Sequence, residues 1–141
     1  MKFPEKYIKH GNFILHSGQT SDIFYDVNAL LTDNFYLRYL LDEVPRSKHY
    51  VGIVTGGALI AIIAHIHHGR FPGSKFSMIK DGELKGEIPD RDWTLIDDVV
   101  TTGNSLLEAI ITAGSKPKNI FVVVDRRERN ENPEVNSIFE P

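Results

Sequence analysis

The stretch WTLIDDVVTTGNSLLEAI, residues 93–110, decides the fold of this 141-residue chain. It begins with an apolar segment that runs straight into two adjacent acids, Asp97 and Asp98. A turn rich in hydroxyl groups follows, and after it an apolar pattern with helical spacing. Strand, turn and helix in this order are typical of α/β proteins that have parallel strands and crossover helices.

The turn has the composition of a phosphate-binding loop. A turn that enters a helix points several backbone N–H groups at one spot, and the helix N-terminus adds partial positive charge. Glycine lets the backbone approach an anion closely, and the neighbouring hydroxyl groups can donate hydrogen bonds to phosphate oxygens. We therefore predict a phosphate site made by Thr101, Thr102, Gly103, Asn104 and Ser105.

The two acids before the turn need a different partner. Adjacent carboxylates repel a phosphate unless a diol or a hydrated cation lies between them. Asp97 and Asp98 are therefore suited to accept hydrogen bonds from ribose hydroxyls, or to hold the water molecules of Mg²⁺. A phosphorylated sugar fits both halves of the motif. The alternative, an ordinary helix N-cap turn beside two surface acids, explains the order of the features less well.

The rest of the chain repeats the alternation of strands and helices. Four apolar runs predict strands over residues 50–54, 75–79, 93–96 and 120–124. Apolar residues at helical spacing predict helices over residues 34–44, 57–68 and 105–113. Asp33 is the expected N-cap of the first helix. The predicted fold class is α/β, a mainly parallel central sheet with flanking helices, whose ligand crevice lies at the carboxyl ends of the strands.

The two ends of the chain fit this alternation less well. Residues 13–15 and 23–27 predict a hairpin, and residues 135–139 predict a further strand. We expect one domain over residues 1–141, in which residues 1–30 and 130–141 form a small hood over the crevice.

Composition excludes several classes of function. Hydrophobic residues make up 41% and charged residues 25% of the chain, which is typical of globular proteins. The net charge of −3 gives no basic field for nucleic acid or an anionic membrane. The absence of cysteine excludes disulfides, thiolate metal sites and cysteine nucleophiles. The longest strictly apolar run, residues 58–64, is too short to span a bilayer, so we expect a soluble cytoplasmic protein.

The run LIDDVVTTGNS, residues 95–105, resembles the phosphoribosyl pyrophosphate motif of the type I phosphoribosyltransferases. The resemblance implies that residues 101–105 bind the ribose 5-phosphate of phosphoribosyl pyrophosphate. It also implies that Asp97 and Asp98 face the ribose hydroxyls, with Mg²⁺ as cofactor and no direct protein ligand to the metal.

Three further segments are most similar to the orotate phosphoribosyltransferases: FILHSGQTSDIFYDVN (13–28), GIVTGGALIA (52–61) and VVVDRRERN (122–130). The resemblance places Phe24 and Tyr25 near the base, where aromatic rings would stack on a flat pyrimidine. It places Arg126 on the orotate carboxylate, which a guanidinium can grip with two parallel hydrogen bonds. The pyrophosphate loop would be formed by Thr55, Gly56 and Gly57.

Some of these roles have plainer alternatives. Phe24 and Tyr25 can be ordinary strand residues, one facing in and one facing out. For Arg127 and Arg129 we expect a solvated basic edge. His65 and His68 lie one helical turn apart and could bind a metal, but cations at a helix C-terminus, His67 included, are also favoured by the helix dipole.

The chain departs from the family between the second and third predicted core strands, in SMIKDGELKGEIPDRDW (77–93). Ile79 stands where the family's mobile loop usually has arginine, and Lys80 keeps the following lysine. Lys85 is the candidate for the further loop lysine, with a solvated lysine as the alternative. The loop is short and has no histidine, and His16 stands at a position often held by lysine.

The resemblance implies an enzyme of pyrimidine nucleotide biosynthesis that converts orotate and phosphoribosyl pyrophosphate to orotidine 5′-phosphate and pyrophosphate. Lys80, Lys85, Asp97 and Asp98 would be its catalytic residues, and Lys80 would also contact pyrophosphate. Its partners would be these two small-molecule substrates, and the protein would be a homodimer. Two alternatives stay open: a related enzyme for another base, and a non-catalytic protein that binds phosphoribosyl pyrophosphate or a nucleotide.

Overall fold

A computed structural model describes residues 1–69, 74–128 and 132–141 of the chain. The strands are β1 (Ile8–Ile14), β2 (Thr20–Tyr25), β3 (His49–Ile53), β4 (Lys75–Lys80), β5 (Glu83–Lys85), β6 (Trp93–Val100), β7 (Asn119–Asp125) and β8 (Asn136–Phe139). The helices are a 3-10 turn (Glu5–Tyr7), α1 (Val27–Leu30), α2 (Asn34–Glu43), α3 (Gly56–His68) and α4 (Asn104–Ala113). No helix in these residues is long and apolar enough to cross a membrane.

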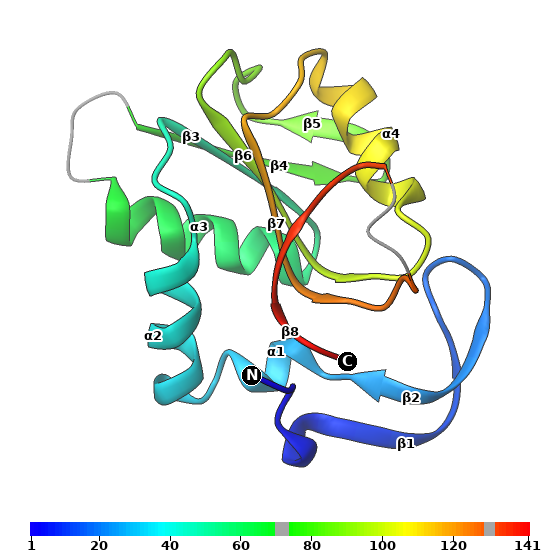
Figure 1. Cartoon of the computed structure of the whole chain (residues 1–141). Helices are drawn as coiled ribbons and strands as arrows, with labels where there is room; N and C mark the ends of the chain where they lie inside the picture. Colours follow the sequence, from blue (N-terminus) through cyan, green and yellow to red (C-terminus); the bar gives the residue numbers. More distant parts are fainter. Residues whose placement is uncertain (70–73, 129–131) are drawn as a thin grey trace.

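The central sheet has six strands in the order β5-β4-β3-β6-β7-β8. Every neighbouring pair is parallel except β4 and β5, which form an antiparallel hairpin. Helices α2 and α3 lie on one side of the sheet and α4 on the other (Figure 1). The predicted α/β class with a mainly parallel sheet is therefore confirmed.

Both faces of the sheet are buried, which explains the continuous apolar runs in its strands. Successive side chains of a strand point to opposite faces. On β6, Leu95 joins the apolar cluster that contains Leu106 of α4, and Ile96 joins the cluster that contains Ile60 of α3. The central strands are thus held from both sides, and their carboxyl ends have fixed positions.

The two ends of the chain differ from the expected hood. The hairpin of β1 and β2 forms a separate two-stranded sheet, but β1 begins earlier than expected, at Ile8. Strand β8 does not join this hairpin. It pairs in parallel with β7 and extends the central sheet, because its apolar Phe139 is buried against Phe3. Among the described residues, β8 is thus separate from the hairpin, although Glu140 after it pairs with Lys2 and accepts a hydrogen bond from the backbone N–H of Phe3 at 3.1 Å.

Side chains at two helix starts hold this hairpin in place. Asp26 accepts a hydrogen bond from the backbone N–H of Ala29 in α1 and pairs with Lys9 of β1 at 3.0 Å. Asp33 caps α2, as predicted, and its carboxylate also receives the amine of Lys6 and the hydroxyl of Tyr7. Each carboxylate thus stabilises a helix N-terminus and the hairpin together.

A buried histidine at the other end of the sheet makes stability depend on pH. His49 begins β3, and its Nε2 lies 2.7 Å from the hydroxyl of Ser77, which itself donates to the backbone carbonyl of Glu87. Nε2 must therefore donate to Ser77, which the neutral imidazole can do. Burial lowers the pKa of His49, and it also lowers that of His68, which bonds the Leu41 carbonyl.

We expect the free energy of unfolding to fall as the pH drops below about 6.5, the pKa of a histidine in an unfolded chain. The unfolded chain then binds a proton before folded His49 does, so acid favours unfolding until the folded pKa is passed. Urea denaturation at a series of pH values measures this slope. His49→Gln keeps a donor for Ser77 and should reduce the slope, and an unchanged slope would contradict this account.

Candidate active site

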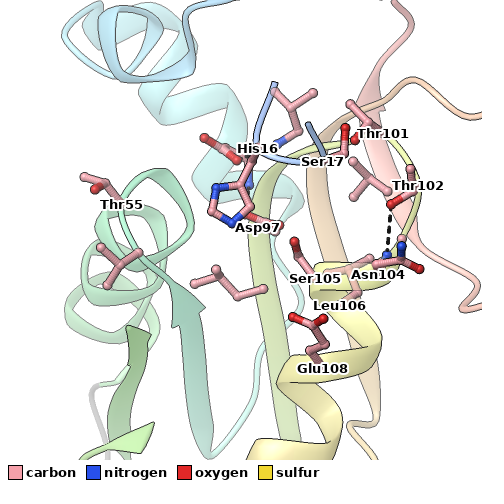
Figure 2. A pocket seen from close by; sticks show the side chains of 16 residues that line it. His16, Ser17, Thr55, Asp97, Thr101, Thr102, Asn104, Ser105, Leu106 and Glu108 are labelled. Atoms are coloured by element: carbon pink, nitrogen blue, oxygen red, sulfur yellow. Dashed lines mark hydrogen bonds between the residues drawn. The ribbon is translucent and has the colours of Figure 1, made fainter. Parts of the chain in front are cut away.

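A cavity of about 520 Å³ opens at the carboxyl ends of β3 and β6. Its lining combines all seven predicted phosphate and sugar residues with the turn after β3 and the tip of the hairpin (Figure 2). The lining residues are His16, Ser17, Ile53, Val54, Thr55, Asp97, Asp98, Val99, Val100, Thr101, Thr102, Gly103, Asn104, Ser105, Leu106 and Glu108. Three segments far apart in the sequence therefore meet where a parallel sheet is expected to bind its ligand.

The predicted phosphate loop, residues 101–105, curls into the first turn of α4. Gly103 precedes the helix with a φ of +88°, in the left-handed region that favours glycine. The backbone N–H of Asn104 donates to the hydroxyl of Thr102 at 3.3 Å (Figure 2). The hydroxyls of Thr101 and Ser105 also line the cavity, so an anion there would meet hydroxyl donors and the N-terminus of a ten-residue helix.

Asp97 and Asp98 lie inside β6 and not after it, because β6 continues to Val100 by pairing with Val124 and Asp125 of β7. This corrects the strand end predicted at residue 96. The backbone N–H of Asp98 donates to Asp97 at 2.8 Å, and that of Val99 donates to Asp98 at 2.7 Å. These bonds fix both carboxylates at the cavity wall.

Asp97 carries an electrostatic penalty. Asp97 is only 8% exposed. Burial raises its pKa well above that of an ordinary aspartate, and the charge of Asp98 raises it further. Within the described residues, no hydrogen bond or ion pair joins Asp97 or Asp98 to a basic side chain. Oxygen ligands of this kind suit a hydrated Mg²⁺ or a diol, so the residues present fit the implied metal.

The turn between β3 and α3 lies directly against the acids. A Cβ atom on Gly56 would come within 2.5 Å of the Asp98 carboxylate, and one on Gly57 within 2.3 Å of the Ile96 carbonyl. Thr55 lines the cavity, whereas Gly56 and Gly57 are buried behind it. The peptide bond between Val54 and Thr55 is cis. The predicted pyrophosphate loop thus adjoins the predicted sugar site.

The two candidate lysines have different environments. Lys80 ends β4 beside this turn, because the backbone N–H of Val54 donates to the carbonyl of Ile79. Lys85 does not lie on an open loop. Asp81 and Gly82, both with positive φ, close a tight hairpin that places Lys85 on β5 opposite Met78, where its amine pairs with Glu83 at 2.7 Å. Neither lysine lines the cavity.

The three residues predicted to bind the base lie outside the cavity lining. Phe24 and Tyr25 end strand β2 of the hairpin, and Arg126 follows β7. Phe24 is half-exposed and packs on Phe13, whereas Tyr25 is buried in the core. This alternation is that of an ordinary strand. The guanidinium of Arg126 lies 5.2 Å from the Tyr25 ring centre and donates to the hydroxyl of Ser21 at 3.0 Å.

Two other expectations concern basic residues. Arg127 was expected at a solvated edge, but its side chain is only 5% exposed and forms an ion pair with Asp125; Arg129 lies outside the described residues. At the end of α3, His65 bonds the Ser74 hydroxyl and His68 bonds the Leu41 carbonyl. Among the described residues, no group of three or more histidine, aspartate and glutamate side chains could hold a metal.

The structure also adds cavity residues that carry no predicted site role. His16 and Ser17 enter from the hairpin, and Glu108 enters from the second turn of α4 (Figure 2). The unusual residue at position 16 was visible in the sequence. The sequence did not show that the hairpin lies beside residues 101–105, because this position depends on contacts between distant parts of the chain. Glu108 lies four residues after Asn104, on the same helix face.

Comparisons with known proteins identify relatives of this chain. No protein-family model matches the chain. The orotate phosphoribosyltransferase of Thermoplasma volcanium is 33% identical over 136 residues, which cover 86% of this chain and 79% of that protein. The crystal structure of orotate phosphoribosyltransferase from Aeropyrum pernix superposes with a TM-score of 0.75, at 24% identity, over 96% of this chain and 89% of its own.

A protein with lower sequence identity has the same fold. The adenine phosphoribosyltransferase of Leishmania donovani has a TM-score of 0.67 at 13% identity, over 96% of this chain and 77% of its own. The sheet order and the superpositions thus define a type I phosphoribosyltransferase fold. Within this class, the identity over most of its length shows that the chain belongs to the orotate phosphoribosyltransferase family.

Proposed function

We propose that this protein transfers ribose 5-phosphate from phosphoribosyl pyrophosphate to orotate in pyrimidine nucleotide biosynthesis, giving orotidine 5′-phosphate and pyrophosphate. One observation carries the proposal: the hydroxyl-rich turn of residues 101–105 and the adjacent acids Asp97 and Asp98 line the same cavity. A phosphate monoester fits the loop, and the adjacent sugar diol fits the acids, so one phosphorylated sugar satisfies both. Family membership supports the assignment of the reaction.

The reaction is a displacement at the anomeric carbon. The bond from that carbon to the pyrophosphate oxygen breaks while a ring nitrogen of orotate bonds to the carbon, through a transition state with oxocarbenium character. The loop residues hold the 5-phosphate and the acids hold the ribose hydroxyls, so the sugar is fixed between the base and the leaving group. Asp97 and Asp98 would hold Mg²⁺, and the bound metal would supply positive charge that favours departure of pyrophosphate.

The remaining roles rest on position. Lys80 lies next to the Thr55 turn, so its amine can reach a pyrophosphate bound there, and we assign it to the leaving group with Thr55, Gly56 and Gly57. Lys85 is exposed and pairs with Glu83, and this weak surface contact leaves its amine free to exchange toward the leaving group. Arg126 and the aromatic pair of the hairpin, Phe24 and Tyr25, would bind orotate at the hairpin side of the cavity.

Mixing the protein with Mg²⁺, phosphoribosyl pyrophosphate and orotate, and following orotate absorbance, tests the proposal. Loss of orotate with release of pyrophosphate is the expected result. Turnover of hypoxanthine, adenine or uracil in place of orotate would assign a different base. Binding of phosphoribosyl pyrophosphate without turnover of any base would support the non-catalytic alternative.

We also propose that the protein is cytoplasmic and acts as a homodimer. Leu59, Ile62 and Ile66 form an exposed apolar stripe on α3, of the kind that a partner subunit covers. Light scattering measures the mass directly, and a monomer at working concentration would contradict the dimer.

His16 is expected to strengthen binding of phosphoribosyl pyrophosphate, because its imidazole enters a cavity that would hold an anionic ligand. His16→Ala should raise KM for phosphoribosyl pyrophosphate about fivefold, which corresponds to the loss of roughly 1 kcal/mol from one exposed charge-assisted contact. His16→Lys should restore the lower KM. Steady-state kinetics measure both, and an unchanged KM in His16→Ala would remove His16 from the site.

A further inference from the structure

A buried ion pair lies behind the phosphate loop, on the side away from the cavity. Asp125 ends β7, and Arg127 follows two residues later. Nε and Nη2 of Arg127 donate to the two carboxylate oxygens of Asp125 at 2.9 and 2.8 Å, and the backbone N–H of Arg127 donates to the same carboxylate at 3.1 Å. The side chain of Arg127 is 5% exposed and that of Asp125 is 13% exposed.

The pair and its neighbour Arg126 contact the backbone just before the loop and at the middle of the loop. Asp125 is the β7 partner of Val100, the residue before the loop, and the backbone N–H of Arg126 donates to the Val100 carbonyl at 2.8 Å. At the middle of the loop, a Cβ atom on Gly103 would lie 3.3 Å from Nη1 of Arg127. The same Nη1 donates to the carbonyl of Pro133 at 3.0 Å. The guanidinium therefore fills the space between the loop and the C-terminal segment.

We infer that Arg127 is a positioning residue for the phosphate loop, an inference that rests on the proposed function of that loop. The loop binds through backbone N–H groups, whose directions depend on the path of the backbone through Gly103. The planar guanidinium supports this path, because it grips Asp125 with two donors and still reaches Pro133 with a third. An ammonium group has no such fixed fork, so lysine cannot replace it.

The role predicts a selective effect on binding of the phosphorylated sugar. Ribose 5-phosphate is the probe, and isothermal titration of the full chain gives its Kd. In Arg127→Gln we expect Kd for ribose 5-phosphate and KM for phosphoribosyl pyrophosphate to rise at least tenfold. KM for orotate, and kcat at saturating phosphoribosyl pyrophosphate, should change less than threefold. Arg127→Lys should stay close to Arg127→Gln.

Two further variants separate positioning from folding. Arg127→Gln leaves Asp125 buried without its partner, which destabilises the fold. The double variant Asp125→Asn/Arg127→Gln removes both charges and should recover thermal stability while binding ribose 5-phosphate as weakly as the single variant. Arg38→Gln removes one exposed arginine from α2 and should match the wild type in every measurement.

A folded double variant that binds ribose 5-phosphate within twofold of the wild type would overturn the inference and leave the proposed function intact. Equal losses in kcat and in both KM values would also overturn it, because they indicate general damage. A wild-type protein that binds neither ribose 5-phosphate nor phosphoribosyl pyrophosphate would overturn the proposed function, and this inference with it.

Discussion

Replacing Asp97 by asparagine is expected to stabilise the protein and to abolish its activity. Burial and the neighbouring charge of Asp98 raise the pKa of Asp97, so its ionised form is less favourable in the folded chain than in the unfolded chain. This cost appears as the pH rises through the raised pKa, and it is present in full above that pKa. Asparagine removes the charge and keeps an oxygen that can accept the N–H of Asp98.

The Tm of Asp97→Asn should therefore lie above that of the wild type. Turnover of orotate should fall at least about 100-fold, because a group that binds the sugar in the transition state is weakened. Scanning calorimetry and the orotate assay on the same preparation measure both effects. Asp90→Asn, which removes an exposed acid, is the control. An Asp97→Asn protein that is less stable and fully active would contradict the assignment.

Adding one methyl group at Gly57 is expected to damage the fold more than any surface substitution. The new Cβ atom would lie 2.3 Å from the Ile96 carbonyl oxygen and 2.9 Å from the Cα of Asp97. Both neighbours are backbone atoms of the central strand β6, so no side chain can turn away to make room. Helix α3 must move from the sheet, and the Thr55 turn moves with it.

We expect Gly57→Ala to lower the free energy of unfolding by about 3 kcal/mol. Urea denaturation measures the loss. In Gly11→Ala, by contrast, the added atom meets only the Phe13 ring at 3.4 Å, an ordinary contact, and stability should change by less than about 0.5 kcal/mol. If the two variants were equally stable, the close approach of α3 to β6 would be wrong.

The fold was predictable because its signals are local. Apolar runs mark strands that are buried on both faces, and Asp33, Gly69 and Gly114 mark helix ends that the structure places there or within a residue. The end of β6 was not predictable, since the strand continues past two acids only through pairing with β7. The C-terminal strand was misplaced for the same reason: its partner lies in another part of the chain.

The site also contains residues that the sequence predicts and residues whose environment it does not predict. The phosphate loop and acids lie within nine consecutive residues, so the sequence alone brings them together. The burial of Arg127 and the engagement of Lys85 depend on neighbours whose geometry no short motif specifies. Asp125 is two residues from Arg127, yet only the fold shows that the pair lies behind the loop. Glu83 likewise reaches Lys85 because the hairpin turns at Asp81 and Gly82.

The most direct test of the phosphate loop is to titrate ¹⁵N-labelled protein with phosphoribosyl pyrophosphate and Mg²⁺ and to follow the backbone amide signals. The account predicts that the largest shifts fall on residues 101–105, followed by Asp98 and Val99 on the adjoining strand. The result that would contradict it is an unchanged set of signals for these amides, with shifts instead in residues that line the groove at Lys116, Lys118 and Asn132.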